Sequence, residues 1–269
     1  MRSFIDQTNR LVQISFPPKR IISLVPSQTE LLFSLGLSEE VIGITKFCVH
    51  PIEWFRNKTR VGGTKTVNIE VIKALKPDLI IANKEENVKD QIEDLQQIAP
   101  VWISDIHTLS EALTMIRSLG EVVDKMDEAE KLVSKINIEF QQMQVVNPPV
   151  KTAYLIWKDP FMAVGNHTFI DDLLTLCGFQ NVFASLPRYP EISMDQLVQS
   201  ECKLLLLSSE PYPFQEKHIV EFRQYLPEAK IALTNGEMWS WYGSRLQFAP
   251  KYFTTLIEQV NSSKPKGLI

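Results

Sequence analysis

The stretch NGEMWSWYGSR, residues 235–245, gathers more rings than an ordinary core segment needs. Trp239, Trp241 and Tyr242 are close neighbours in it, and Arg245 follows. Adjacent side chains point in different directions along any regular backbone, so these rings cannot all enter one core. Aromatic faces beside a guanidinium suit a flat, partly apolar ligand that carries carboxylate or amide groups. We therefore predict that at least one of these rings lines a ligand site.

Further candidate residues lie in loops that follow predicted strands. In an open α/β sheet, ligands bind outside the carboxyl ends of the strands. These loops add the following residues to the predicted site: Ser27, Phe47, Cys48, His50, Thr64, Lys65, Trp157 and Phe161. Any single ring could instead close the edge of a core, and this alternative applies especially to Trp157, which ends an apolar run.

Cys48 and His50 stand two residues apart and could offer a thiolate and an imidazole to a metal ion. Two side chains on one loop are fewer than a protein metal site needs. A loop residue followed by Pro51 is the plainer interpretation of His50. We assign no metal to the protein itself, but direct ligation by Cys48 or His50 stays open. For a ligand that binds through its polar rim, both residues become rim contacts.

Two acidic residues open predicted helices at corresponding places in the two halves of the chain. Glu70 precedes VIKALKPDLII, and Asp195 precedes QLVQSECKLLLL. In both halves an apolar strand then follows the helix. A carboxylate in the first turn of a helix is favoured by the helix macrodipole, which explains both residues without any further role.

The composition of the 269 residues is that of a globular protein, with 44% hydrophobic and 22% charged residues. The net charge of −4 and the lack of a basic stripe argue against a nucleic-acid partner. No P-loop, dinucleotide fingerprint, G-x-S-x-G or H-E-x-x-H pattern occurs, so we do not predict an enzyme. The N-terminal residues lack the pattern of a secretory signal. We expect either a cytoplasmic protein or one whose leader lies outside this sequence.

Short apolar runs alternate with amphipathic ones, which predicts mostly parallel sheets covered by helices. The predicted strands are residues 20–25, 40–45, 78–83, 100–104 and 152–157. The predicted helices between them are residues 27–37, 69–76 and 88–98. The first of these helices opens with a predicted capping box of Ser27 and Glu30. Residues 109–146 carry no strand signal, and their spacing predicts a long helix from about 127 to 145.

The pattern predicts two α/β lobes separated by a helical segment. The predicted parts are an N-terminal lobe (1–108), a helical connector (109–147) and a C-terminal lobe (148–269). The lobes also resemble each other, because LLFSLGL (31–37) matches LLTLCGF (173–179) with Gly36 against Gly178.

Four segments resemble the substrate-binding proteins of ABC importers for cobalamin and iron chelates, the helical-backbone metal receptors of periplasmic binding protein class III. They are FIDQTNRLVQISFPPKRIISLVPSQTELLFSLG, VGGTKTVNIEVIKALKPDLIIANKE, GNHTFIDDLLTLCGFQNVF and YPEISMDQLVQSECKLLLLSSEPYPF. The similarity covers nearly the whole chain, and the chain looks most similar to the cobalamin-binding branch.

This resemblance implies two Rossmann-like lobes joined by a long rigid backbone helix, with the ligand in the cleft between them. It implies a receptor that captures a corrinoid or another small metal chelate and delivers it to an ABC permease and ATPase complex. Such a protein acts as a monomer and meets the membrane only through the transporter. The resemblance places it in the periplasm or the cell envelope.

The resemblance also assigns roles to the candidate residues. Stacking and edge contacts to the ligand would come from Phe47, Trp157, Trp239, Trp241 and Tyr242. Arg245 and Lys65 would address amide or carboxylate groups on its rim. Glu70 and Asp195 match the positions at which one acid on each lobe docks onto permease arginines.

Two departures from the family pattern keep alternatives open. Cobalamin receptors often carry a tryptophan in the loop before the helix of Glu70, where this chain has Thr64. An iron-siderophore or haem receptor of the same fold is therefore one alternative. Exported members carry a signal peptide or a lipobox cysteine, which this sequence does not show, so a cytoplasmic corrinoid-handling protein or enzyme is the other.

Overall fold

The computed structural model describes residues 1–261, and the chain divides into two compact units. The N-terminal unit comprises Met1–Ile106, Ser110–Ile136 and Trp241–Arg245. The C-terminal unit comprises His107–Leu109, Asn137–Ser240 and residues 246–261. Each unit contains a mostly parallel sheet with helices, which confirms the predicted α/β class. Over residues 1–261, no helix combines the length and the apolar character needed to cross a bilayer.

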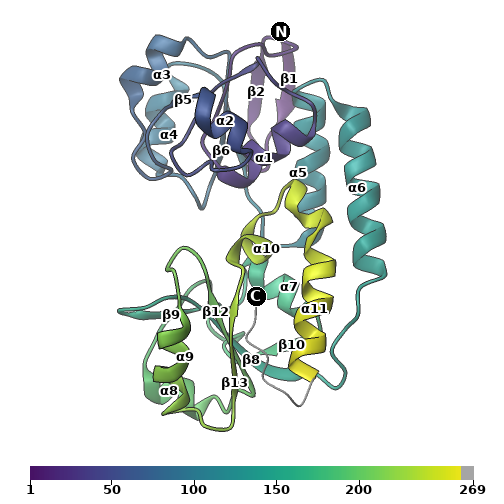
Figure 1. The fold of residues 1–269 in the computed structure, drawn as a ribbon. Helices are drawn as coiled ribbons and strands as arrows, with labels where there is room; N and C mark the ends of the chain where they lie inside the picture. Colours follow the sequence, from purple (N-terminus) through teal and green to yellow (C-terminus); the bar gives the residue numbers. More distant parts are fainter. Residues whose placement is uncertain (262–269) are drawn as a thin grey trace. The chain divides into compact units, whose positions relative to one another are not determined.

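The N-terminal unit is built on a five-stranded sheet in the order β5-β4-β3-β6-β7, with every pair parallel. Figure 1 labels β5 and β6 of this sheet. Its strands are β3 (Ile21–Ser23), β4 (Val41–Ile44), β5 (Thr59–Arg60), β6 (Leu79–Asn83) and β7 (Val101–Ser104). All five residues of β6 are buried. A continuous apolar run of this kind is typical of a parallel strand that is covered on both faces. Parallel pairing brings the carboxyl ends of these strands to one edge of the sheet.

Four helices come from the connections between these strands. They are α1 (Pro26–Ser34), α2 (Ile52–Asn57), α3 (Ile69–Leu75) and α4 (Lys89–Gln96). Ile72 of α3 and Leu95 of α4 share one buried core cluster with Ile22 and Ile80 of the sheet. Each such side chain contributes about 1.5–3 kcal/mol when fully buried.

The start of α1 differs from the sequence expectation. The N-cap is Val25, Pro26 occupies the first turn and Ser27 lies inside the helix, so the predicted capping box of Ser27 and Glu30 is wrong. Proline is favoured at the first helical position because its fixed φ already suits the helix. This shift releases the carboxylate of Glu30 for a different contact, described below.

Two parts of the chain differ from the predicted plan of an N-terminal lobe and a helical connector. An antiparallel hairpin of β1 (Arg2–Ile5) and β2 (Leu11–Ile14) opens the chain and was not predicted. The segment predicted as a connector forms two helices, α5 (Leu109–Val122) and α6 (Met126–Gln141), with Asp124 at φ +59° between them. The predicted long helix thus begins where expected and ends about one turn early. The boundaries drawn at 108 and 147 stay predictions.

The C-terminal unit contains a six-stranded sheet in which β8, β10, β12 and β13 pair in parallel. Its strands are β8 (Val150–Trp157), β9 (Phe161–Ala163), β10 (Phe179–Asn181), β11 (Glu191–Ile192), β12 (Leu204–Ser208) and β13 (Lys230–Thr234). β9 pairs antiparallel with β8 and with β11. The order β10-β8-β12-β13 repeats the order β4-β3-β6-β7 of the other unit, as the matching sequence segments suggest.

The helices of this unit are α7 (Phe169–Leu176), α8 (Met194–Gln199), α9 (Glu216–Arg223), α10 (Gly236–Ser240) and α11 (Ala249–Asn261), with a 3-10 turn η1 (Ser244–Gln247). Leu197 of α8 and Phe222 of α9 pack with Leu155 of β8 and Leu205 of β12 in one buried cluster. Gly178 follows α7 at φ +81°, as Gly36 follows α1 at φ +84°. Both glycines that the sequence match aligns therefore occupy the left-handed region that glycine favours after a helix.

Candidate functional site

Buried polar side chains stand at the carboxyl edge of the N-terminal sheet, where the strand-end rule predicts a site. Asn83 ends β6 and donates from Nδ2 to Ser104 Oγ, at the end of β7, over 2.9 Å. Thr29 of α1 donates to Ser23 Oγ, at the end of β3, over 2.8 Å. Gln28 Nε2 also donates to Ser104 Oγ. These bonds tie α1 and three strand ends together, so the loops above them start from a fixed base.

Two loops predicted to bind ligand lie side by side on this edge. The amide of Lys46 donates to Gly62 O over 2.8 Å. A Cβ built on Gly63 would lie 3.2 Å from Phe47 Cε2, so the Phe47 ring rests on the backbone of the second loop. Phe47 is 51% exposed and Thr64 is half-buried. The structure therefore joins the TKFCVHP and VGGTKT loops into one surface with an exposed ring.

The second loop is held by side chains from the region of α4. Asn87 Nδ2 donates to Thr64 O, and Gln91 Nε2 donates to Lys65 O, both over 2.9 Å. Lys65 itself is exposed and its Nζ donates to Glu85 O over 2.5 Å. Asn87 and Gln91 are not among the residues predicted from the sequence. Asn87 follows β6, so the rule that ligands bind at strand ends also applies to it.

Cys48 does not take part in the exposed surface. Its side chain is fully buried, and Thr29 Oγ1 and Thr45 Oγ1 each lie 3.1 Å from its sulfur. Burial raises the pKa of the Cys48 thiol above its ordinary value, so the thiol stays protonated. The predicted role of Cys48 as a rim contact is not supported, because its sulfur is enclosed by hydroxyl groups. Among residues 1–261, no group of three or more His, Cys, Asp or Glu side chains could hold a metal ion.

The His50 ring contacts the ring of Trp241, which lies far from it in the sequence. Residues 241–245 belong to the N-terminal unit, and the ring centroids of His50 and Trp241 lie 5.6 Å apart in an edge-to-face arrangement. Arg245 Cζ lies 4.7 Å from the centroid of the Trp241 ring. Its position in the sequence predicts a place in the C-terminal lobe (148–269); the contacts instead put it beside the His50 loop.

Glu30 anchors this segment, which sequence reasoning did not foresee. Arg245 Nε donates to Glu30 Oε2 over 3.0 Å, and Nη2 donates to Oε1 over 2.6 Å. A Cβ on Gly243 would lie 2.6 Å from Ser27 O, so the backbone of residues 241–245 passes directly against α1. Ser27, Trp241 and Tyr242 are all buried, which leaves Trp241 only 7% exposed.

The three predicted rings of the C-terminal unit have different environments. Trp157 ends β8 with 38% of its surface exposed, and its ring meets Tyr212 edge-on at 5.7 Å. Phe161 packs against the core, with its ring 5.3 Å from that of Phe222. Trp157 is therefore the predicted ring of this unit that offers an exposed face, and Phe161 contributes mainly to packing.

Trp239 requires a correction. Its side chain is fully buried, its ring lies 4.2 Å from that of Phe253, and its Nε1 donates to Thr234 Oγ1 over 2.8 Å. A side chain without exposed surface and with its polar atom already bonded is a core residue. The predicted ligand contact of Trp239 is therefore not supported by the structure.

Both predicted docking acids lie in the first turn of a short helix and are exposed. Glu70 follows the N-cap Asn68 of α3, and its side chain pairs with Lys73 over 3.0 Å at the surface. Asp195 follows the N-cap Ser193 of α8, where a capping box with Gln196 closes the turn. Their positions are those expected from the sequence, and their role in docking stays a prediction.

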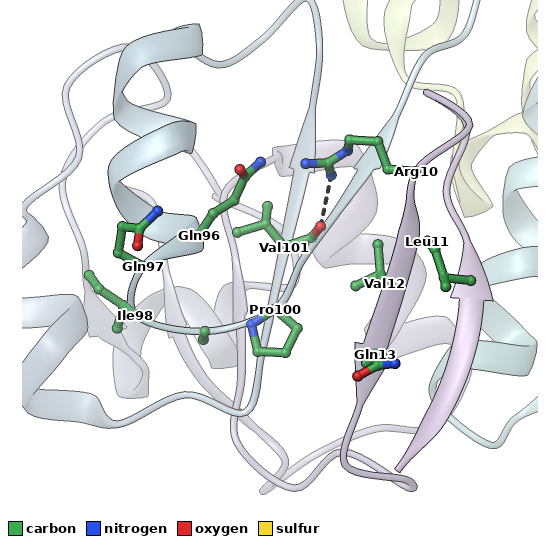
Figure 2. A pocket seen from close by; sticks show the side chains of 10 residues that line it. Arg10, Leu11, Val12, Gln13, Gln96, Gln97, Ile98, Pro100 and Val101 are labelled. Atoms are coloured by element: carbon green, nitrogen blue, oxygen red, sulfur yellow. Dashed lines mark hydrogen bonds between the residues drawn. The ribbon is translucent and has the colours of Figure 1, made fainter.

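Two pockets of the N-terminal unit lie away from these loops. One of about 440 Å³ lies between the start of β2 and the end of α4. Figure 2 shows the Arg10 guanidinium directed at the Val101 carbonyl, with Gln96 and Gln97 opposite. A second, of about 320 Å³, also involves Arg10 and Gln96. No predicted site residue lines either pocket. The Arg10 guanidinium already pairs with the Asp6 carboxylate. We therefore take the loops, and not these pockets, as the candidate ligand site.

Comparison with known proteins decides the family. A family model described as periplasmic binding protein matches residues 21–225, more than half of the chain. The chain belongs to the periplasmic binding protein family. Members of this family are solute-binding components of transport systems. The match confirms the family that the sequence resemblance indicates.

Individual members of the periplasmic binding protein family are similar over most of the chain. A vitamin B12-binding protein of Vibrio campbellii is 27% identical over 83% of this chain and 81% of its own length. An uncharacterised ABC transporter substrate-binding lipoprotein of Bacillus subtilis is 27% identical over 72% of this chain and 65% of its own length. The crystal structure of the periplasmic vitamin B12-binding protein BtuF of Vibrio cholerae covers 93% of this chain and 100% of its own, with a TM-score of 0.76 and 23% identity. That structural likeness confirms the predicted two-lobed fold.

Proposed function

We propose that this protein is the substrate-binding component of an ABC importer and that it captures a corrinoid. The observation that carries the proposal is the gathering of three loops, residues 45–51, 61–67 and 241–245, at the carboxyl edge of the N-terminal sheet. The similarity to vitamin B12-binding proteins over most of the chain supports a corrinoid as the chemical class.

The chemistry of these loops suits such a ligand. A corrinoid is a flat macrocycle whose rim carries amide side chains, and its cobalt is held by the nitrogens of the ring. The exposed Phe47 ring offers an apolar face, while His50, Thr64 and Lys65 offer polar groups to the rim. The metal belongs to the cargo, so the buried Cys48 thiol is not required as a ligand. Trp157 of the C-terminal unit offers a second exposed ring, whose contribution is tested separately by Trp157→Ala.

We further propose that the protein is a receptor and not an enzyme, and that it acts as a monomer. Delivery to the permease and its ATPase would use Glu70 and Asp195, whose exposed carboxylates stand at helix first turns. An exposed acid of this kind can pair with a permease arginine without disturbing the fold, because neither side chain supports a core. Asp195 is one methylene shorter than glutamate, so its reach is smaller.

Calorimetric titration with cyanocobalamin, cobinamide, haemin and a ferric siderophore tests the ligand class. We expect heat of binding with both corrinoids and none with the other two compounds. Cobinamide lacks the lower nucleotide of cyanocobalamin, so equal affinities would indicate that the loops hold the corrin ring itself. Binding of haemin or the siderophore alone would replace the corrinoid by the corresponding alternative. No heat with either corrinoid would refute the proposal.

A further inference from the structure

Glu30 and Arg245 form a shielded ion pair in the N-terminal unit. The two hydrogen bonds at 3.0 and 2.6 Å make it a two-pronged contact between guanidinium and carboxylate. The side chains are only 17% and 12% exposed, respectively. A shielded pair of this kind is screened little by salt and fixes orientation as well as distance. By contrast, the pair of Arg2 with Glu121 in the same unit is exposed on both sides.

The held guanidinium in turn fixes a ring. Arg245 Cζ lies over the Trp241 ring at 4.7 Å from its centroid, a cation–π contact. The same ring meets His50 edge-on at 5.6 Å. His50 belongs to the loop of residues 45–51, which also carries the exposed Phe47 ring. A continuous chain of contacts therefore runs from Glu30 on α1 to the loop that carries the proposed ligand contacts.

The backbone of the segment is held against α1 at a second point. Gly243 lies so close to Ser27 O that any Cβ would clash at 2.6 Å. This backbone contact sets the distance of the segment from α1 but does not itself orient the side chains of Trp241 and Arg245. The ion pair with Glu30 orients the Arg245 guanidinium, and the guanidinium in turn lies against the Trp241 ring.

We propose that Glu30 is a positioning residue that holds the loop of residues 45–51 in its binding conformation, acting through Arg245 and Trp241. This inference rests on the proposed function, because the loop is the one assigned to the ligand. Glu30 itself does not touch the ligand. Its loss is expected to weaken binding by loosening the loop and not by removing a contact.

The first measurement needs no ligand. Glu30→Gln keeps the shape of the side chain and removes the charge, and Glu121→Gln removes a charge from an exposed pair as the matched control. Acrylamide quenching of Trp241 fluorescence is obtained as the difference between each protein and its Trp241→Phe counterpart. We expect Glu30→Gln to make the protected Trp241 ring accessible, while Glu121→Gln leaves it protected. An unchanged quenching constant in Glu30→Gln overturns the proposal.

The second measurement uses cyanocobalamin. Glu30→Gln should weaken binding about tenfold, which corresponds to about 1.4 kcal/mol, with less than about a threefold change in Glu121→Gln. In a Trp241→Ala background the same Glu30→Gln change should cost less than about twofold, because the path through the ring is already broken. Additive losses overturn the proposal. If Glu30→Gln does not fold, Arg245→Lys serves instead, since lysine keeps the charge but loses the two-pronged geometry.

The two measurements distinguish a failure of the positioning role of Glu30 from a failure of the proposed function. Exposure of Trp241 in Glu30→Gln together with no corrinoid binding by the parent protein would refute the proposed function and leave the ion pair as the anchor of the ring. Corrinoid binding by the parent that Glu30→Gln leaves unchanged would refute the positioning role and leave the function standing.

Discussion

Replacing Trp239 by phenylalanine should lower the stability of the protein and leave its ligand affinity intact. The indole Nε1 would no longer donate to Thr234 Oγ1, a loss of about 1 kcal/mol. The smaller ring would leave a void of roughly 40 Å³ beside Phe253, which costs about 1 kcal/mol at ~24 cal/mol per Å³. The expected decrease in the free energy of unfolding is therefore about 2 kcal/mol.

Replacing Phe47 by alanine should have the opposite profile. Half of the ring is already exposed, so its removal should lower the free energy of unfolding by only about 1 kcal/mol. The lost stacking contact should weaken corrinoid binding by about 1–1.5 kcal/mol, or roughly tenfold. The pair of variants thus separates a packing ring from a binding ring, although the sequence offers both as site candidates.

Urea unfolding gives the free energy of unfolding of each variant, and calorimetric titration gives its Kd for the corrinoid. The titrations are done at a temperature where both variants are folded, so that stability does not enter the Kd. A Trp239→Phe protein with parental stability and a tenfold weaker Kd would refute the assignment of Trp239 to the core. A Phe47→Ala protein with parental affinity would remove the exposed ring from the site.

Three further outcomes are expected. Glu70→Arg should leave the Kd for cyanocobalamin unchanged and abolish uptake through the reconstituted importer; loss of binding itself would contradict a docking role. Gly178→Ala should lower the free energy of unfolding by about 1–3 kcal/mol, measured in urea, because φ is +81° and a Cβ would lie 2.4 Å from Val146 O. Burial raises the pKa of the Asp6 carboxyl, but the Arg10 amide, the Thr8 hydroxyl and the Arg10 guanidinium outweigh it, so the folded pKa is lowered. Its contribution to stability is therefore full above the ordinary pKa and disappears as the pH falls through the lower folded value. Asp6→Asn should flatten the acid limb of the stability curve, and an unchanged limb would contradict this account.

Much of the fold followed from local pattern. The buried strands β3, β4, β6 and β7 were predicted within two residues at each end, because continuous apolar runs between turn signals report burial on both faces. Glu70 and Asp195 were likewise placed correctly in helix first turns. Local signals failed where two explanations competed, as at α1, where Pro26 set the helix start and Ser27 became an interior residue. The β1–β2 hairpin was missed because its short strands alternate too briefly to be distinguished from loop.

The sequence by itself determined the family, the α/β class, the strand-end loops and the presence of a ring cluster near Arg245. Tertiary structure decided what each ring does. Trp239 and Trp241 are separated by one residue, yet one enters the core beside Phe253 and the other meets His50. Both residues are tryptophans in the same short stretch, so no local sequence pattern predicts which of them enters the core. The difference comes from the partners: Phe253 follows Trp239 within the same unit, whereas His50 lies almost two hundred residues before Trp241, and only the folded structure brings His50 and Trp241 together.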